Sequence, residues 1–312
     1  MVFFQKKLFD TLNYPIGALA AFPFYWRSEL VHGISLSEIS IERNLLLTSF
    51  AGAFLPRILL RKTLNSSAIK KVITTSRQNT ERLRQIGVLS HKIVHIPPGV
   101  NSTFFEPLLE TEIQSIRKDV CENFNKFLIT YFGPPLLTRG VGTLLKALKV
   151  ALTISPQLRN RICTLFLFRV REHEYDIQTE KINGLISSYN YSKIVRIKST
   201  FLSANEIASY IAASDLIILP FKHVISDFPV SVMEAMSMGK PVISTRLDGI
   251  PELLENDRGI VVDPNDFENL GKIIAYFSEN LSELNGYGKR ARDYMLQRPT
   301  WRDSAERVLE LF

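Results

Sequence analysis

Short apolar runs alternate along most of this chain with longer segments in which apolar residues recur every three or four positions. FLITYFG (127–133), CTLFLFRV (163–170) and LIILPF (216–221) are nearly continuous apolar runs, which is typical of strands buried on both faces. Between such runs the helical period predicts helices at 143–155, 175–189 and 204–215. Strands that alternate with helices of this length predict an α/β fold with a parallel, doubly wound sheet.

The same alternation is present earlier in the chain, from about residue 66. The elements predicted there are a strand at 70–76, a helix at 76–87 and a strand at 92–100. Ser76 is a suitable N-cap for the helix, and Gly87 is a suitable residue to end it.

A polar stretch, residues 101–125, separates the two runs of strands and contains one helical segment. We therefore predict an N-terminal domain over 1–120 and a C-terminal domain over 121–298, followed by an amphipathic helix in 299–312. Residues 1–65 contain no glycine-rich strand-to-helix turn of the kind that opens a Rossmann-like domain. The N-terminal domain is thus predicted to be truncated or atypical.

Composition narrows the class of protein. The chain has 312 residues, of which 46% are hydrophobic and 22% charged, and this is typical of a soluble globular protein with room for two domains. Its two cysteines, Cys121 and Cys163, form no metal-binding spacing and no disulfide framework, which favours a reducing, cytoplasmic location. Five histidines without a metal-binding motif give no reason to expect a protein-bound catalytic metal.

Basic residues gather beside an apolar run. The net charge is +7, and Arg57, Arg61, Lys62, Lys70 and Lys71 lie close to LLLTSFAGAFLPRILL at 45–60. Such a segment suits an anionic membrane surface or a phosphorylated acceptor, and hence a peripheral location at the inner membrane face. The commoner alternative is a buried helix with a solvated basic edge. No run reaches the roughly 18–20 apolar residues that span a bilayer.

The most informative segment is 226–263. The apolar strand at 216–221 leads through a loop to a predicted helix at 230–239 that carries Glu234. A second strand at 241–245 and a loop at 247–252 follow. Parallel α/β proteins hold phosphate esters where such a loop meets the N-terminus of a helix. A carboxylate one turn into the helix is placed to accept hydrogen bonds from a ribose diol.

This segment resembles the nucleotide-sugar-binding signature of the retaining family 4 (group 1) glycosyltransferases of the GT-B fold. In that family it runs roughly E-G-F-P-L-V-L-L-E-A-M-A-x-G-x-P-V-V-A-T-x-x-G-G-I-P-E. Weaker similarity covers VITTSRQNTERLRQIGV (72–88), IPPGVNSTFFEP (96–107) and YFGPPLLTRGVGTLLKAL (131–148), so that the resemblance extends over about 66–312. It implies two Rossmann-like domains, with the last helix packed back on the N-terminal domain.

The resemblance also implies a reaction. A sugar would move from a nucleoside diphosphate sugar to a sugar or lipid-linked acceptor, with retention at the anomeric carbon. It implies no metal, no other cofactor and no nucleic-acid partner.

Roles for individual residues follow from the family signature. The diphosphate would be held by Arg139 and the backbone amides at the start of the 230–239 helix, near Pro229, Val230 and Ser231. Glu234 would bind the ribose hydroxyls. The remaining residues are Ser226, Asp227 and Phe228 around the sugar, Gly133 and Gly249 near the phosphates, and His32 as the counterpart of the family's active-site histidine.

The chain departs from the family at several of these positions. The first of the family's two signature glutamates is replaced by Ser226, and the glycine beside it by Asp227, which could take over the glutamate's contacts after a small backbone shift. Pro134 replaces an arginine, and Arg139 replaces a lysine.

Each predicted role has a structural alternative. Glu234 could be an exposed helix carboxylate, and Arg139 a solvated loop cation. Ser226 and Asp227 could cap the following helix. Phe228 could be only a core residue, and His32 an ordinary, partly buried histidine.

Two rival functions remain open on the sequence. A chain that has lost one signature glutamate and part of the acceptor side could be a catalytically degenerate binding or scaffold subunit, or a fragment of a longer protein. It could also be another nucleotide-sugar enzyme of similar fold, such as a phosphorylase or epimerase. Residues 1–65 discriminate between the glycosyltransferase and the scaffold subunit. A sheet edge with a cleft facing Glu234 favours the glycosyltransferase, and a bare helical arm favours the scaffold.

Overall fold

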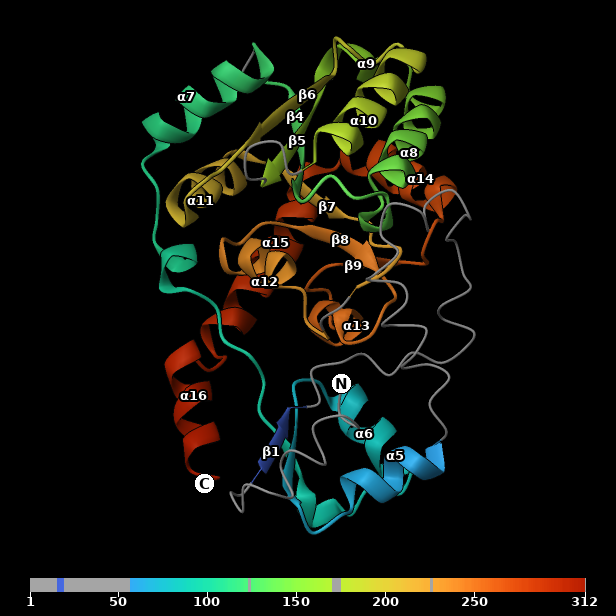
Figure 1. The fold of residues 1–312 in the computed structure, drawn as a ribbon. Helices are drawn as coiled ribbons and strands as arrows, with labels where there is room; N and C mark the ends of the chain where they lie inside the picture. The colour runs from blue at the N-terminus through green and yellow to red at the C-terminus, as the bar shows by residue number, and fades with distance from the viewer. Residues whose placement is uncertain (1–15, 20–56, 123–124, 170–174, 225–226, 312) are drawn as a thin grey trace.

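A computed structural model describes residues 16–19, 57–122, 125–169, 175–224 and 227–311. Most of them belong to a C-terminal region built on a six-stranded sheet with the order β6-β5-β4-β7-β8-β9, in which every neighbouring pair is parallel (Figure 1). The strands are β4 (Phe127–Gly133), β5 (Ile162–Arg169), β6 (Val195–Thr200), β7 (Leu216–Leu219), β8 (Val242–Thr245) and β9 (Ile260–Val262). The predicted α/β fold with a parallel, doubly wound sheet is confirmed.

The strand order contains one topological switch point. From β4 the chain adds β5 and β6 on one side, then returns to β7 on the other side of β4 and continues outward to β9. Ligands in open α/β sheets bind outside the carboxyl ends of the strands at such a point. Gly133 ends β4, and the loop that leads towards residue 227 follows β7, so the segment singled out in the sequence begins at the switch point.

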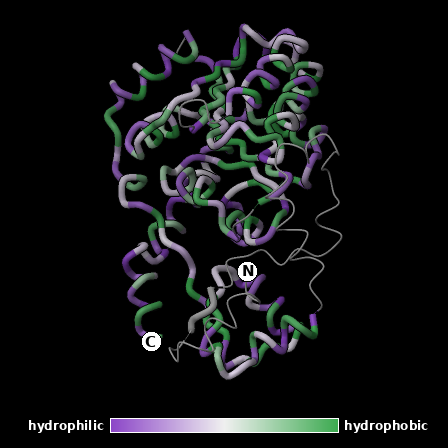
Figure 2. The backbone as a smooth tube through the Cα atoms, viewed as in Figure 1, coloured by the Kyte–Doolittle hydropathy of each residue, from purple (hydrophilic) through white to green (hydrophobic). Residues whose placement is uncertain are grey.

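Helices cover both faces of this sheet. Those in the C-terminal region are α8 (Val141–Ile154), α9 (Leu158–Arg161), α10 (Asp176–Ser188), α11 (Ala204–Ala213), α12 (Val230–Ser237), α13 (Ile250–Leu254), α14 (Phe267–Phe277) and α15 (Leu281–Leu296). Helices α8, α10 and α14 pack together on one side, and α11, α12 and α15 lie on the other (Figure 1). The interior strands β4 and β5 are buried along almost their whole length, as their apolar sequences require. Figure 2 shows the apolar residues concentrated along this sheet and the helices beside it.

A smaller region lies below this sheet in Figure 1; we call residues 16–19 and 57–100 the N-terminal unit. It contains β1 (Ile16–Leu19), α5 (Arg57–Leu64), β2 (Ile69–Thr74), α6 (Arg77–Gln85), η1 (Ser90–Lys92) and β3 (Ile93–His95). Its strands form a parallel sheet in the order β1-β2-β3. Its core is small and consists of Leu60, Leu64, Ile69, Val72, Leu83 and Val88.

Predictions for the N-terminal unit hold at α6 and need correction elsewhere. Ser76 caps α6 by accepting a hydrogen bond from the N–H of Asn79, and Gly87 follows the helix with φ 86°. The strand predicted in 92–100, with Pro97, Pro98 and Gly99 as its end, is three residues long and stops just before these residues, because proline has no N–H to donate to a neighbouring strand. Strand β1 was not predicted, and it forms one edge of the small sheet, with β3 at the other.

The two regions are joined by a connector and by the end of the chain. The connector contains η2 (Ser102–Phe105) and α7 (Glu110–Cys121). The last helix, α16 (Trp301–Leu309), lies beside the N-terminal unit (Figure 1). The hydroxyl of Ser304 donates a hydrogen bond of 2.8 Å to the carbonyl oxygen of Pro97. A Cβ at Gly99 would lie 2.2 Å from the backbone nitrogen of Trp301, so the two segments are in direct backbone contact.

Candidate functional site

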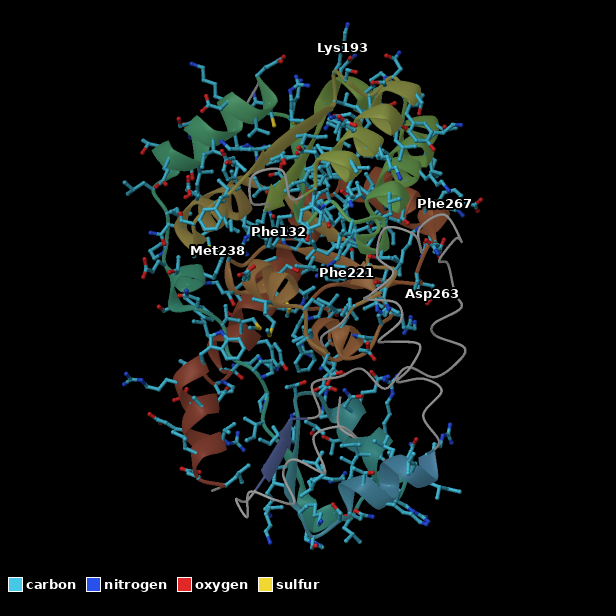
Figure 3. The ribbon with its side chains drawn as sticks, viewed as in Figure 1. Phe132, Lys193, Phe221, Met238, Asp263 and Phe267 are labelled. Carbon is cyan, nitrogen blue, oxygen red and sulfur yellow. The ribbon has the colours of Figure 1, made fainter. Side chains whose placement is uncertain are left out.

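A pocket of about 440 Å³ opens at the carboxyl ends of β4 and β5, beside the N-terminus of α12. It is lined by Phe132, Gly133, Pro134, Arg139, Arg169, Val224, Pro229, Val230, Ser231 and Glu234. Figure 3 shows Phe132, which lines the pocket, near the middle of the molecule. The pocket therefore lies at the switch point of the sheet and brings together Gly133, Arg139, Pro229, Val230, Ser231 and Glu234 from the predicted set.

Glu234 lies on α12 and is only 6% exposed. Burial raises the pKa of its carboxyl above the usual range, and the nearby guanidinium of Arg169 partly opposes this shift. The alternative of an ordinary exposed helix carboxylate is therefore wrong. A buried carboxylate that faces a pocket is a strong acceptor for ligand hydroxyls.

Arg139 is held in the pocket wall by the backbone around it. It ends the short helix η3 (Leu137–Arg139), and its guanidinium lies 5.2 Å from the centre of the Phe221 ring, which Figure 3 shows in the middle of the molecule. The next residue, Gly140, has φ 82° and touches the chain after β7 so closely that a Cβ would lie 1.7 Å from the carbonyl oxygen of Pro220. Only glycine fits there, and the close contact fixes the position of η3 relative to the end of β7.

Arg169 is a pocket residue that we did not predict. It is the last residue of β5 and the only charged one in an otherwise apolar strand. Because the carboxyl ends of parallel strands meet at one edge of the sheet, a charge at that end was a signal for a site. Pro134 stands where the family has an arginine, and Arg169 supplies a second cation to the same pocket.

His223 lies close to this arrangement but does not line the pocket. Its imidazole is buried, and burial together with the positive charge of Arg139 lowers its pKa to about 4. The imidazole is therefore neutral at pH 7 and adds no positive charge beside Arg139.

The N-terminus of α12 faces the pocket through Val230 and Ser231. Pro229 occupies the N-cap position and has no side-chain group to bind the first N–H groups of the helix. These N–H groups, and the positive end of the helix dipole, are suited to an anion in the pocket. Because Pro229 is the N-cap, the alternative that Asp227 caps this helix is wrong.

Phe228 and Gly249 lie behind the pocket wall. Phe228 is 2% exposed, and Gly249 packs so tightly on it that a Cβ would lie 2.4 Å from its ring. The N–H of Gly249 donates a hydrogen bond of 3.1 Å to the carbonyl oxygen of Asp227. The loop after β8 thus supports the turn before α12 from behind.

The carboxylate of Asp227 points towards the N-terminal unit. It is buried, and its Oδ2 accepts hydrogen bonds from the hydroxyls of Thr75, at 2.9 Å, and Ser76, at 2.8 Å. Ser226 and His32 lie outside the described residues, and their predicted roles stay predictions. Among the described residues, no group of three or more His, Cys, Asp and Glu side chains is arranged to hold a metal ion.

Comparison with known proteins finds similarity over the part of the chain that supplies the pocket residues from Arg169 to Glu234. Residues 140–280 match the family described as Glycosyl transferases group 1. This part of the chain is therefore similar to the group 1 glycosyltransferases. WcaL of Escherichia coli strain K12, named as a colanic acid biosynthesis glycosyltransferase, is 32% identical over 154 residues. That alignment covers 47% of this chain and 37% of WcaL, so the chain matches little more than a third of that relative's length.

Solved structures support the same fold over a longer part of the chain. Sucrose-phosphate synthase from Thermosynechococcus elongatus superposes with a TM-score of 0.74 at 19% identity, over 99% of this chain and 70% of that one. HepE of Anabaena in complex with UDP-glucose superposes with a TM-score of 0.66 at 19% identity, over 81% of this chain and 66% of that one. The predicted GT-B fold and the resemblance to group 1 glycosyltransferases are confirmed.

Proposed function

We propose that this chain is a glycosyltransferase that moves a sugar from a nucleoside diphosphate sugar to an acceptor, with retention of anomeric configuration. The observation that carries the proposal is the pocket at the switch point, where one buried carboxylate, two arginines and a helix N-terminus face the same space. WcaL is named a glycosyltransferase, and HepE was solved with UDP-glucose in place. These relatives support a nucleotide sugar as the ligand of this pocket.

The charges of the pocket are suited to such a donor. Arg139, Arg169 and the first N–H groups of α12 would hold the diphosphate and stabilise it as the leaving group. Glu234 would accept hydrogen bonds from the ribose hydroxyls. His32 and Ser226 keep their predicted roles near the reacting sugar, and no metal or other cofactor is part of the proposal.

Binding and turnover test the proposal separately. Calorimetric titration with UDP, GDP and ADP should show micromolar affinity for one of them, and Glu234→Ala should lose most of it. Exposed Glu279, replaced by Ala, is the matched control and should bind as the unmodified chain does. Transfer or slow hydrolysis of the corresponding nucleotide sugar then separates an enzyme from a degenerate binding subunit, which would bind without turnover.

The acceptor side is proposed to meet an anionic membrane surface. Residues 57–100 contain nine Lys and Arg residues and a single acidic residue, Glu81, so this segment alone accounts for the basic character of a chain of net charge +7. On α5, Ile58 is 64% exposed and Leu59 41% exposed, with exposed Arg57, Arg61 and Lys62 around them. Apolar side chains framed by cations suit the boundary between lipid headgroups and acyl chains. A lipid-linked acceptor would be presented there. Among the described residues, no helix is long and apolar enough to cross a bilayer.

Vesicle flotation tests the proposed contact with an anionic membrane surface. The chain should float with vesicles that contain phosphatidylglycerol and stay behind with pure phosphatidylcholine, and the attachment should weaken as salt is raised. Arg61→Glu combined with Lys62→Glu should abolish flotation, whereas Arg302→Glu, an exposed basic residue on α16, should not. Equal flotation of the two variants would exclude α5 as the contact.

A further inference from the structure

Asp227 connects the start of α12 to the other region of the molecule. Its Oδ2 accepts two hydrogen bonds, from Thr75 at 2.9 Å and from Ser76 at 2.8 Å, and its side chain is buried. Thr75 and Ser76 directly precede α6 in the N-terminal unit, about 150 residues earlier in the chain. One carboxylate oxygen is therefore shared between two hydroxyls that belong to another part of the fold.

The direction of the Ser76 hydrogen bond is fixed by the cap of α6. The Ser76 oxygen already accepts a hydrogen bond of 3.0 Å from the N–H of Asn79. Its own proton is therefore free to point at Asp227, and the N-terminus of α6 orders the donor that the carboxylate needs. Hydrogen bonds to an ionised, buried carboxylate are among the stronger ones in proteins.

The same turn is held from its opposite side. The carbonyl oxygen of Asp227 accepts the N–H of Gly249, and the ring of Phe228 fills the space against Gly249. The turn 227–229 is thus fixed between α6 and the loop after β8. Its far end is Pro229, which together with Val230 and Ser231 forms one wall of the pocket.

Two further carboxylates of the same segment also contact α6. Asp248 Oδ1 lies 2.9 Å from Nη1 of Arg82, and both side chains are almost completely buried. Glu252 accepts the backbone N–H of Arg77 at 2.8 Å and forms an ion pair with its side chain at 3.1 Å. Residues 227–252, which supply part of the pocket lining, therefore present three carboxylates to the N-terminal unit.

We infer that Asp227 is a positioning residue, which fixes the turn 227–229 against α6 and so sets the position of this turn, beside which the sugar of the donor would lie. Asp227 stands at a position that is glycine in the family signature, and glycine has no side chain to make these contacts. Glu234, Arg139 and Arg169 line the pocket from the C-terminal region alone. Loss of the Asp227 contacts therefore loosens the turn beside the sugar, whereas α12 stays packed on α15 and β8 and keeps its first N–H groups at the diphosphate. The inference rests on the proposed function.

Two variants test it from opposite sides of the contact. Asp227→Ala should lower kcat/KM for the nucleotide sugar about tenfold or more, because hydrogen bonds to a charged group are lost. The double variant Thr75→Val with Ser76→Ala should give the same loss, and the triple variant should be no worse than either, because the three groups form one interaction. Affinity for the nucleoside diphosphate alone should change less than about twofold in all three. Asp227→Asn keeps an acceptor oxygen and should recover part of the activity.

The control is Asp263→Asn, which removes an exposed ion pair with Arg246 and should change nothing measured. If Asp227 had only a structural role, Asp227→Ala would lower the midpoint of thermal unfolding. Its kcat/KM, calculated for the fraction of protein that binds nucleotide, would equal that of the unmodified chain. That result would overturn the inference. An equally large loss of diphosphate affinity would also overturn it.

Hydrogen exchange of α6 makes the contact testable without any activity. In the unliganded chain, Asp227→Ala should speed amide exchange at Asn79 and along α6, and Asp263→Asn should not. Unchanged exchange would contradict the contact itself. If the unmodified chain binds no nucleoside diphosphate, the proposed function fails, and the exchange result still decides whether Asp227 holds the turn.

Discussion

The two regions of this molecule are stabilised in different ways. The C-terminal region has six parallel strands, and apolar side chains from both faces of the sheet fill one large core. The N-terminal unit has three short strands and a core of six described residues, and it makes several buried polar contacts with the C-terminal region. Apolar burial alone defines the first region, because it needs no particular partner. The second is positioned by hydrogen bonds and ion pairs, which require specific atoms at specific places.

The largest effect should come from opening the large core. Phe166 on β5 and Leu83 on α6 are both fully buried. Phe166→Ala should cost about 3–5 kcal/mol of unfolding free energy and abolish nucleotide binding, because β5 carries one edge of the pocket. Leu83→Ala should cost about 2–4 kcal/mol and leave nucleotide affinity nearly unchanged, because all pocket residues lie in the C-terminal region.

Denaturant unfolding and calorimetric titration of the two variants check this pair. A Leu83→Ala protein that is folded and binds no nucleotide would show that the pocket depends on the N-terminal unit as a whole. The two regions would then not be stabilised independently of each other.

A somewhat smaller effect should follow from breaking the buried ion pair between the regions. Arg82→Met leaves the carboxylate of Asp248 buried beside an apolar side chain and should cost about 3 kcal/mol. Arg246→Met breaks an exposed pair with Asp263 and should cost less than about 1 kcal/mol. Chemical denaturation of both variants at low and high salt measures the difference. Similar costs for the two would mean that burial of the Arg82 pair contributes nothing.

The attachment of the last helix should be weaker still. Ser304→Ala removes the hydrogen bond to the carbonyl oxygen of Pro97 and should cost about 1 kcal/mol. The loss should be confined to the N-terminal unit and α16, so amide exchange at residues 93–100 should speed up while exchange in β4 and β5 stays the same. Faster exchange in the large sheet would show that the two regions unfold as one.

The smallest expected effect is the pH dependence of stability that Glu234 contributes in the pocket. The pKa of Glu234 is raised in the folded chain, so the native state binds its proton more tightly than the unfolded state does. Stability attributable to this group is therefore greatest at low pH and falls as the pH rises through the folded pKa. Glu234→Gln should be slightly more stable than the unmodified chain near pH 7, and the difference should vanish as the pH is lowered.

Nucleotide affinity should move in the opposite direction. The carboxylate must be ionised to accept two ribose hydroxyls, so affinity should fall as the pH drops into the range of its raised pKa. Titrations between pH 5 and 8 would show this fall. Affinity that is independent of pH over that range would exclude a role for ionised Glu234.

Local pattern predicted the C-terminal region in detail. The apolar run at 127–133 corresponds to β4 over the same residues, and Gly239, with φ 71°, ends the predicted helix that carries Glu234. Helices α14 and α15 were not individually predicted, although their apolar periodicity was present. Predictions were weakest for the N-terminal unit. A strand as short as β1 gives little periodic signal, and it is stable only as the neighbour of β2.

The sequence by itself determined the α/β class and the strand followed by the helix that carries Glu234, and the family resemblance pointed to the cation Arg139. These depend on residue type and spacing within short segments, which no distant part of the chain needs to complete. Only the tertiary structure decided that Arg169 joins the pocket and that Asp227 faces Thr75 and Ser76. Those side chains meet partners 65 to 152 residues away in the chain, and the direction of a side chain across such a distance is set by how the layers pack.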